Sequence, residues 1–579
     1  MRSFFIALLV VFFMGCMAPH SDLPVPPFRL SESKNTTPTY QEGIDWWRKL
    51  EASTPRVRIF EYGMTDAGYP LHIVVLSGKH HAHLEEYTDS RHSRLLINNA
   101  IHPGEPDGVD ASMMLAYDLL NSDSIQKRWL PNTDIFIIPF YNIGGALNRN
   151  STTRANQNGP EEYGFRGNAQ NLDLNRDFVK SDSRNARTFA QLIQAIDPHL
   201  YVETHVSNGA DYPYVMTYLS TQEDKIGEPY TSALRDTLTP HLEKAMGKAG
   251  FPMVPYVNVH GVSPENGYAT FYDMPRYSTG YLALLGIPGY ITETHMLKPY
   301  EQRVEATYSF LWSCVEEMRL NPLEDWKVSW QVNLGMQDSI ALDWTLDSSQ
   351  VRAWVFNGYA AGYKPSDISG EPRLFYDRTK PYSTKIPYWG WMKPQHKVSR
   401  PTAYILRRGF VEVEERLKAS GVNMEALESD TTIRVDVFHI DTFSTYPQPY
   451  EKHYAHHGTK VSTSEQDVTF HQGDWLIPLN NAHARFIIEV LEPEAPDGYF
   501  NWNFFDAVLQ QKEWYSPYVF EDEAALLLQQ DSVLRNGYNA MMDSVAGFKD
   551  HGEQQLYWIY QHSPRYERSH LIHPVYRIR

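Results

Sequence analysis

A chain of 579 residues exceeds one ordinary domain of about 150 residues, so we expect at least two domains. Its composition, 42% hydrophobic and 21% charged, is that of a globular protein and excludes wholesale disorder. The formal net charge of -18, with no long run of lysine and arginine, argues against nucleic acid as a partner.

Residues 1–21 are expected to form an export leader. Arg2 precedes an apolar stretch from Phe4 to Phe13 that is too short to span a bilayer, and Cys16 follows shortly after it. The cysteine resembles the lipobox of bacterial lipoproteins. We therefore expect an exported protein, either periplasmic, anchored to the outer membrane only through a lipid at Cys16, or plainly secreted. Because Cys314 is the only other cysteine, a lipidated chain has no pair for an intramolecular disulfide.

Residues 22–325 alternate between short apolar runs and helical patterns. Apolar spacing near 3.6 predicts helices over 107–120 and 183–196. Strands are predicted over 71–77, 94–101, 134–142, 199–205 and 286–294. This alternation predicts an α/β domain with a mixed, mainly parallel sheet and helices on both faces.

The pattern changes after about residue 325. Residues 326–495 are expected to form a smaller β-rich or mixed accessory domain, and residues 496–579 a helical C-terminal extension. The accessory strands are predicted over 351–359, 431–440 and 484–491, with one helix over 411–421. Both boundaries are approximate, because no low-complexity linker marks them.

Metal-capable side chains follow two of the predicted strands. His102 and Glu105 come directly after the run 94–101, and His205 ends the run 199–205. The carboxyl ends of strands are where open α/β sheets place their ligand sites. One histidine at a strand end is ordinarily a capped or core residue, but three such residues favour a metal site. Two histidines and one glutamate leave a fourth position open, as in catalytic zinc, so we expect one zinc ion per chain.

Two further motifs, in 164–178 and 289–303, complete a family pattern. The order is His-x-x-Glu, then Asp-Leu-Asn-Arg at 173–176, then the strand-end His205, then Glu293. In this order and spacing, residues 50–320 resemble the zinc carboxypeptidase family, the carboxypeptidase A-like metallopeptidases. The resemblance implies the fold of that family for residues 22–325 and His102, Glu105 and His205 as zinc ligands.

The resemblance also implies roles for other residues. Glu293 would be the catalytic glutamate that moves the proton of the attacking water, and Asn175 with Arg176 would bind the terminal carboxylate of the substrate. The simpler alternatives are ion pairs within the chain. Those pairs would join Glu293 to Lys298 or Arg303, and Arg176 to Asp173 or Asp177.

For two further roles, the spacing of the sequence does not single out one residue. The family has an arginine that stabilises the oxyanion, for which we choose Arg166, with Arg154 and Arg149 as alternatives. It also has a tyrosine before the late glutamate, and here three tyrosines qualify equally. These are Tyr272, Tyr277 and Tyr281.

Three functions follow from these residues. The first is a metallocarboxypeptidase that uses zinc and Glu293 to hydrolyse C-terminal peptide bonds. The second is a zinc deacylase or amidase acting on acylated amino acids or cell-wall peptides. It is favoured by departures from the digestive peptidases, which have an arginine where Pro103 and Gly104 stand and Leu-Arg-Asp after the late glutamate. The third is a lipid-anchored binding protein without catalysis, whose signature would be the loss of one of these residues.

Overall fold

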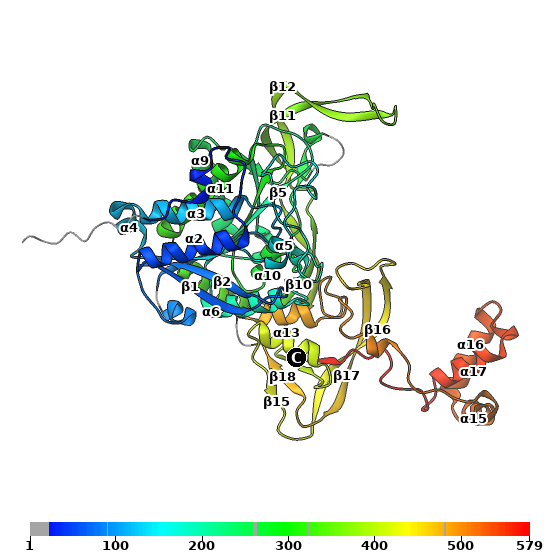
Figure 1. Cartoon of the computed structure of the whole chain (residues 1–579). Coiled ribbons are helices and arrows are strands. Elements are labelled where there is room, and N and C mark those ends of the chain that lie inside the picture. Colours follow the sequence, from blue (N-terminus) through cyan, green and yellow to red (C-terminus); the bar gives the residue numbers. More distant parts are fainter. Residues whose placement is uncertain (1–22, 90, 259–262, 322, 480–481) are drawn as a thin grey trace, which may run out of the picture.

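The computed structural model describes residues 23–89, 91–258, 263–321, 323–479 and 482–579, and one large sheet runs through its centre (Figure 1). The predicted leader and Cys16 lie outside the described residues. Among the described residues, none of the helices is both long and apolar enough to cross a membrane.

The central sheet has eight strands in the order β1-β2-β4-β3-β5-β9-β6-β7. Its strands are β1 (Val57–Met64), β2 (Pro70–Leu76), β3 (Ser93–Asn98), β4 (Thr133–Ile138), β5 (Leu200–Ser207), β6 (Met216–Ser220), β7 (Met253–Pro255) and β9 (Gly289–His295). The pairs β3–β4, β3–β5, β5–β9 and β6–β7 are parallel and the other three antiparallel. This confirms the predicted mixed, mainly parallel sheet.

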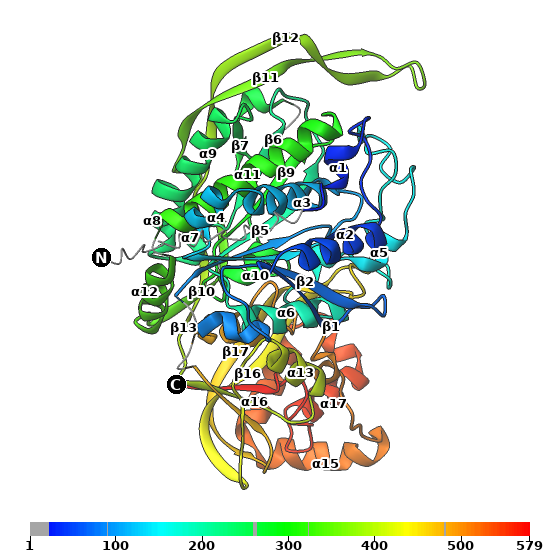
Figure 2. The ribbon, with the colours of Figure 1, turned by 60° about the vertical axis from the view of Figure 1, so that its left-hand side comes forward.

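Helices cover both faces of this sheet, because every residue of β4 and β5 is buried although successive side chains point to opposite faces (Figure 2). The helices are α1 (Pro27–Leu30), α2 (Tyr40–Ser53), α3 (Asp107–Leu120), α4 (Asp123–Trp129), α5 (Ile143–Leu147), α6 (Arg184–Ile196), α7 (Glu223–Ile226), α8 (Tyr230–Ala233), α9 (Thr239–Lys248), α10 (Ser278–Ala283), α11 (Tyr300–Leu320) and α12 (Leu323–Gly335). The predictions over 107–120 and 183–196 are thereby confirmed as α3 and α6. A side-chain cap fixes the start of α6, where the Ser183 hydroxyl accepts from the Ala186 N–H.

Strands after residue 338 form three further groups. The pair β10 (Ser339–Leu346) and β13 (Met392–Ser399) stands alone, and the long hairpin β11 (Arg352–Pro365) and β12 (Pro372–Trp389) adds the short β8 (Tyr268–Ala269). A six-stranded sheet contains β15 (Glu425–Ala426), β18 (Trp475–Pro478), β14 (Ala403–Leu406), β19 (Val575–Ile578), β16 (Thr431–Thr445) and β17 (His456–Phe470). Because β8 pairs with β12, the first region and the accessory strands share a sheet.

The remaining helices confirm one accessory prediction and correct two. The helix predicted over 411–421 is α13 (Val411–Ala419). The strand predicted over 484–491 is wrong, because these residues form the buried helix α14 (Ala484–Leu491); a short apolar run does not distinguish a strand from a buried helix. The last 84 residues, 496–579, are not wholly helical either. They hold α15 (Pro517–Gln530), α16 (Ser532–Ser544) and α17 (Gly552–Gln561), and then return to the six-stranded sheet as β19.

The accessory part packs directly on the first region. Phe486 of α14 meets Tyr281 of α10 edge to face at 5.8 Å, and both rings belong to one continuous buried core. Arg276 forms an ion pair with Asp497, with 2.6 Å between Nη2 and Oδ1. The accessory part is therefore fixed against the loop that leads into α10.

Asp110, buried in α3, makes the stability of this fold depend on pH. Burial raises the pKa of its carboxyl to about 7, against a hydrogen bond from Tyr300 that lowers it. Between about pH 4 and pH 7 the unfolded chain loses this proton and the folded chain keeps it, so stability falls as the pH rises. We expect Asp110→Asn to exceed the wild type in free energy of unfolding at pH 8 by a few kcal/mol, since one pKa unit is about 1.4 kcal/mol.

Urea unfolding of both proteins between pH 4 and pH 8 measures this difference. The exposed Asp123 of α4 offers a matched control, Asp123→Asn, for which no such divergence is expected. Parallel curves for wild type and Asp110→Asn would contradict the prediction.

Candidate metal centre

His102 and Glu105 lie in the loop that joins β3 to α3. Ala100 adopts a left-handed backbone conformation, with φ at 55°, and the Glu105 N–H donates to the His102 carbonyl at 2.8 Å. This tight turn points both side chains into the protein, where each is 2% exposed. Pro106 then stands directly before α3. The predicted position of these residues, just past the end of a buried strand, is confirmed.

His205 joins them from β5, the parallel neighbour of β3. Its Nδ1 lies 3.2 Å from the Nδ1 of His102 and 3.0 Å from the Oε2 of Glu105. The His102 Nδ1 lies 3.3 Å from the same carboxylate oxygen. Three atoms that can each bind a metal therefore form a nearly equilateral triangle.

This triangle fits a zinc ion. With zinc–ligand bonds of about 2.0–2.1 Å, two ligands at tetrahedral positions are about 3.3–3.4 Å apart. The three observed separations, 3.0, 3.2 and 3.3 Å, lie close to that value. Two imidazoles and one carboxylate are also a donor set that zinc accepts while leaving one position open.

A second carboxylate stands behind each histidine. The Nε2 of His102 lies 2.9 Å from Asp173 Oδ1, and the Nε2 of His205 lies 3.2 Å from Glu203 Oε2. Glu203 is fully buried and accepts from the hydroxyl of Ser278 at 2.6 Å. A carboxylate at Nε2 favours the proton on that nitrogen and leaves the Nδ1 lone pair free for a metal.

The charges of the site favour a cation at its centre. Burial alone would raise the pKa of Glu105, but Arg154 and His102 outweigh it and hold this pKa well below its usual range. Burial alone would lower the pKa of His205, but bonds to Glu105 and Glu203 raise it to about 10. The carboxylates beside His205 therefore favour a positive charge at this point of the site.

Glu293 faces this group from β9. The register of β5 and β9 pairs it with His205, and its carboxyl lines the same cavity as the three ligands. Burial, with the nearby charge of Glu105, raises its pKa to about 7 against the opposing charge of His205. Neither proposed ion pair of Glu293 is present. Lys298 contacts Asp211 and Arg303 contacts Asp107 instead.

Asn175 and Arg176 line the same cavity. They lie in a single 3₁₀ turn (Leu174–Arg176), which Asp173 caps by accepting from the Asn175 N–H at 2.9 Å. Arg176 lies over the ring of Tyr277, 4.7 Å from the guanidinium carbon to the ring centroid. Among the described residues Arg176 makes no ion pair within 4 Å, so the predicted alternative of a pair with Asp173 or Asp177 is absent.

The structure distinguishes the three candidate arginines by their position relative to the cavity. Arg166 lines the cavity, donates to Asp173 at 2.9 Å and lies 3.7 Å from Glu105. Arg154 binds Glu105 at 2.7 Å. Arg149 donates to the backbone of Thr37 and does not line the cavity. Arg166 and Arg154 thus belong to the site and Arg149 does not.

The structure also distinguishes the three candidate tyrosines. Tyr277 lines the cavity, whereas Tyr281 is buried behind it and Tyr272 lines a different one. Sequence reasoning missed Tyr256, which lines the cavity from the segment after β7. No local pattern marks it, because its place depends on the pairing of β7 with β6.

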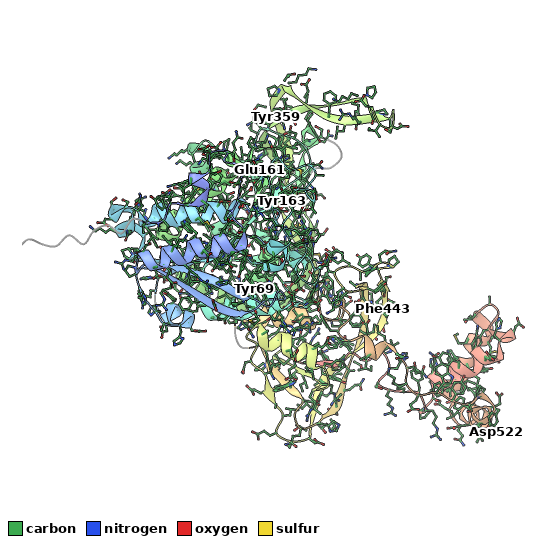
Figure 3. All side chains as sticks on the ribbon, in the orientation of Figure 1. Tyr69, Glu161, Tyr163, Tyr359, Phe443 and Asp522 are labelled. Atoms are coloured by element: carbon green, nitrogen blue, oxygen red, sulfur yellow. The ribbon has the colours of Figure 1, made fainter. Side chains whose placement is uncertain are left out.

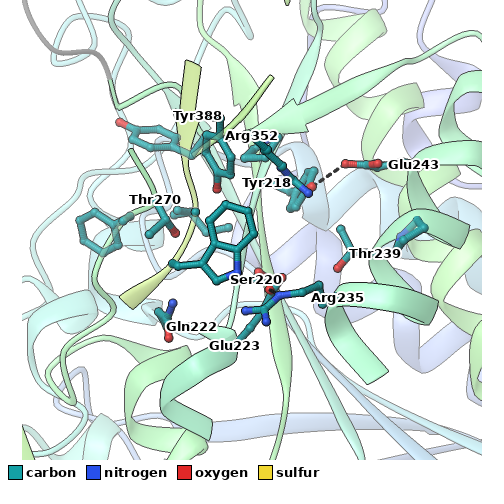
Figure 4. Close-up of a pocket in the computed structure, with 17 residues that line it drawn as sticks. Tyr218, Ser220, Gln222, Glu223, Arg235, Thr239, Glu243, Thr270, Arg352 and Tyr388 are labelled. Carbon is teal, nitrogen blue, oxygen red and sulfur yellow. Dashed lines mark hydrogen bonds and ion pairs between the residues drawn. The ribbon is translucent and has the colours of Figure 1, made fainter. Parts of the chain in front are cut away.

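The cavity has a volume of about 290 Å³ and shares three lining residues with a second cavity, which Figure 4 shows. These shared residues are Leu219, Tyr256 and Phe271. The second cavity has a volume of about 70 Å³, room for roughly five waters. Its walls are polar: Glu243 accepts from the Tyr218 hydroxyl at 2.6 Å, and Arg352 of β11 lies on the same wall.

The sequence of this chain is similar to those of known proteins. Residues 44–278 match the family model described as zinc carboxypeptidase, a span that includes the three metal-binding candidates and ends before Glu293. Carboxypeptidase 2 of Trichophyton rubrum is 21% identical over 436 residues, which cover 72% of this chain and 74% of that protein.

Two solved structures are similar over part of the chain. Carboxypeptidase A of Helicoverpa armigera is 14% identical, with a TM-score of 0.37, covering 50% of this chain and 75% of that one. A metallo-carboxypeptidase from Burkholderia cenocepacia is 16% identical, with a TM-score of 0.36, covering 47% of this chain and 67% of that one.

Replacing Glu203 tests the metal centre. We expect Glu203→Gln to weaken zinc binding about 10- to 100-fold, because a neutral amide favours the proton on the His205 Nε2 less strongly than a carboxylate does. Competition with a chromophoric chelator measures the dissociation constant without reference to any activity. The matched control is Asp118→Asn, since Asp118 pairs with Arg29 away from the cavity. Unchanged zinc affinity in Glu203→Gln would contradict the role of this carboxylate.

Proposed function

Residues 44–278 place this chain in the zinc carboxypeptidase family, and we propose that it is a hydrolase that removes C-terminal residues from peptides with one zinc ion at His102, Glu105 and His205. One observation carries this proposal. The metal-binding triangle, the Glu293 carboxyl and the Arg176 guanidinium all line a single cavity.

The chemistry divides between the metal and Glu293. A zinc ion bound to the triangle supplies a Lewis acid that lowers the pKa of water and polarises a carbonyl. Glu293 accepts the proton of the attacking water and passes it to the leaving amine. A carboxyl with a pKa of about 7 suits both tasks, because it can hold or release a proton near neutral pH.

Arg176 and Asn175 would fix the substrate by its terminal carboxylate. The ring of Tyr277 covers one face of the guanidinium, whose Nη1 donates to the Asn175 carbonyl at 2.8 Å. The guanidinium makes no ion pair within 4 Å with any residue that the structure describes, so its remaining edge, beside Tyr450, can bind a carboxylate. The buried Oδ1 of Asn175 has no partner among the described residues, so its amide is available to a ligand. These two residues select a substrate with a free C-terminus.

Arg166 is our choice for stabilising the negative charge on the carbonyl oxygen. Arg154 is already bound to Glu105 at 2.7 Å and is mostly buried, with 16% of its side chain exposed. Arg166 keeps 44% of its side chain exposed and lines the cavity. Its own hydrogen bond goes to Asp173 at 2.9 Å, so it can turn towards a substrate while the bond between Arg154 and Glu105 stays in place.

The second cavity would receive the side chain of the terminal residue. It adjoins the first at Leu219 and Phe271. Glu243 and Arg352 favour polar side chains there over large apolar ones. The substrates are peptides outside the cytoplasm if the leader at residues 1–21 directs export as expected.

Glu293→Gln tests the chemistry. We expect this variant to keep its zinc and its fold but to lose hydrolysis about 10²- to 10⁴-fold, because glutamine cannot carry the proton. The measurement is stepwise C-terminal trimming of a mixed peptide pool, read by mass spectrometry, which also reports which terminal residues are accepted. Zinc content is determined on the same preparations.

The outcomes separate the candidate functions. Trimming by the wild type but not by the variant supports the carboxypeptidase. Zinc without trimming, together with release of acyl groups from acylated amino acids, would identify a deacylase instead. Failure to bind zinc would overturn both and leave the binding protein.

Arg176→Lys tests the terminal-carboxylate site. A single ammonium cannot give two parallel hydrogen bonds, so we expect KM for free-acid peptides to rise about tenfold or more with a smaller change in kcat. Peptides amidated at the C-terminus lack the charge that Arg176 binds, and we expect them to be poor substrates of the wild type. Equal hydrolysis of amidated and free peptides would contradict this role for Arg176.

A further inference from the structure

The loop of residues 446–455, which joins β16 to β17, reaches from the accessory part to the first region. Phe443, which Figure 3 labels, lies two residues before the end of β16 and packs on His456 at the start of β17, with 4.6 Å between the ring centroids. Between the two strands the chain turns back where Tyr450 and His453 exchange backbone hydrogen bonds of 2.7 and 3.0 Å. The tip of the loop is therefore a tight turn of two residues.

The two residues of this tip, Glu451 and Lys452, have left-handed backbone conformations. Their φ angles are 46° and 78°. Asparagine and glycine are the usual residues where both central positions of such a turn have positive φ, because larger side chains are strained there. A strained turn persists only where the contacts around it determine its conformation. The contacts of residues 450–453 therefore have to hold this turn in place.

Aromatic and ionic contacts hold both ends of the turn. The Nε2 of His453 lies 2.7 Å from the Oδ2 of Asp182. The ring of Tyr450 stacks on Trp502, with 6.3 Å between centroids and 19° between planes, and the Arg276 guanidinium lies over these two rings at 5.7 and 5.0 Å. Asp182 and Arg276 belong to the first region, so the turn is fixed against that region.

Glu451, at the tip, binds the backbone of the candidate active site. Its Oε2 accepts from the Asp173 N–H at 2.8 Å, although Asp173 is 278 residues away in the sequence. Asp173 in turn lies 2.9 Å from the Nε2 of His102 and accepts from the Asn175 N–H at 2.9 Å. One side chain of the accessory part therefore holds the residue that orients both a candidate zinc ligand and the turn with Asn175 and Arg176.

Tyr450 lies beside the second residue of that turn, Arg176. A guanidinium can only donate hydrogen bonds, so in this contact the phenol oxygen of Tyr450 accepts and its own O–H stays available to donate. Tyr277 already covers one face of the guanidinium, and Tyr450 is 37% exposed. A carboxylate bound at the remaining edge of Arg176 would therefore meet a guanidinium and a phenol O–H together.

We propose that residues 450–453 complete the site that binds the terminal carboxylate of the substrate. Tyr450 donates its O–H to the carboxylate that Arg176 binds, and Glu451 is a positioning residue that acts through the Asp173 N–H. The substrate class that this arrangement selects is a peptide with a free C-terminal carboxylate. The inference rests on the proposed function and extends it, because it assigns part of the substrate site to the accessory part.

Kinetics and zinc affinity of full-chain variants test the two roles. Tyr450→Phe keeps the ring on Trp502 but lacks the O–H, so we expect KM for free-acid peptides to rise about tenfold with little change in kcat. Its zinc dissociation constant should equal that of the wild type. The matched control is Tyr446→Phe in the same loop, where the ring lies on His457, and its KM should not change. An unchanged KM in Tyr450→Phe would overturn the role of its hydroxyl.

Glu451→Ala removes the acceptor for the Asp173 N–H. We expect KM to rise about tenfold and the zinc dissociation constant about threefold or more, because Asp173 is no longer held against His102. Glu451→Gln keeps an amide oxygen that accepts from the same N–H, so both constants should stay within about twofold of the wild type. The control is Glu428→Ala, which replaces an exposed glutamate of the accessory part.

The zinc measurements separate this inference from the proposed function. Competition with a chelator reports zinc affinity whether or not any peptide is hydrolysed. Wild-type zinc affinity and KM in Glu451→Ala, or equal losses in Glu451→Gln and Glu451→Ala, would overturn the positioning role of Glu451. If the wild type hydrolyses no free-acid peptide, the proposed function fails and the role of Tyr450 with it, while the zinc affinities of these two variants still decide whether Glu451 positions Asp173.

Discussion

The negative charge buried at the end of β3 and β5 is the feature on which the rest of the site depends. Glu105 contacts both histidines, and Asp173 and Glu203 stand behind them. So many carboxylates in a buried site are costly unless a cation lies among them. Arg154, which forms an ion pair with Glu105 at 2.7 Å, offsets part of that charge.

The sheet explains why these groups can converge. β3, β5 and β9 are parallel neighbours, so their carboxyl ends meet at one edge, and each delivers one part of the site. Glu293 is level with His205 because the register of β5 and β9 makes them partners. Asn175 and Arg176 come from a loop instead, and a hydrogen bond between Asp173 and His102 connects that loop to the candidate metal site.

Much of this could be predicted from local sequence. The helices at 107–120 and 183–196 follow from apolar periodicity, and the candidate metal ligands His102, Glu105 and His205 follow from polar residues at strand ends. The prediction over 484–491 was wrong because eight mostly apolar residues carry no period that separates a strand from a buried helix. Local sequence could not predict Tyr256 or the choice between Arg166 and Arg149, since both depend on how distant segments pack.

By itself the sequence indicated five strands of the central sheet, two of the helices that cover it, the three candidate metal-binding residues and the family model that residues 44–278 match. Only the tertiary structure decided which arginine and which tyrosine reach the cavity, that Glu203 backs His205, and that β11 of the accessory part brings Arg352 to the second cavity. The physical reason is how far apart in the sequence the interacting residues lie. Periodicity and turn chemistry act over a few residues, whereas these contacts join residues brought together by sheet pairing and burial across the whole chain.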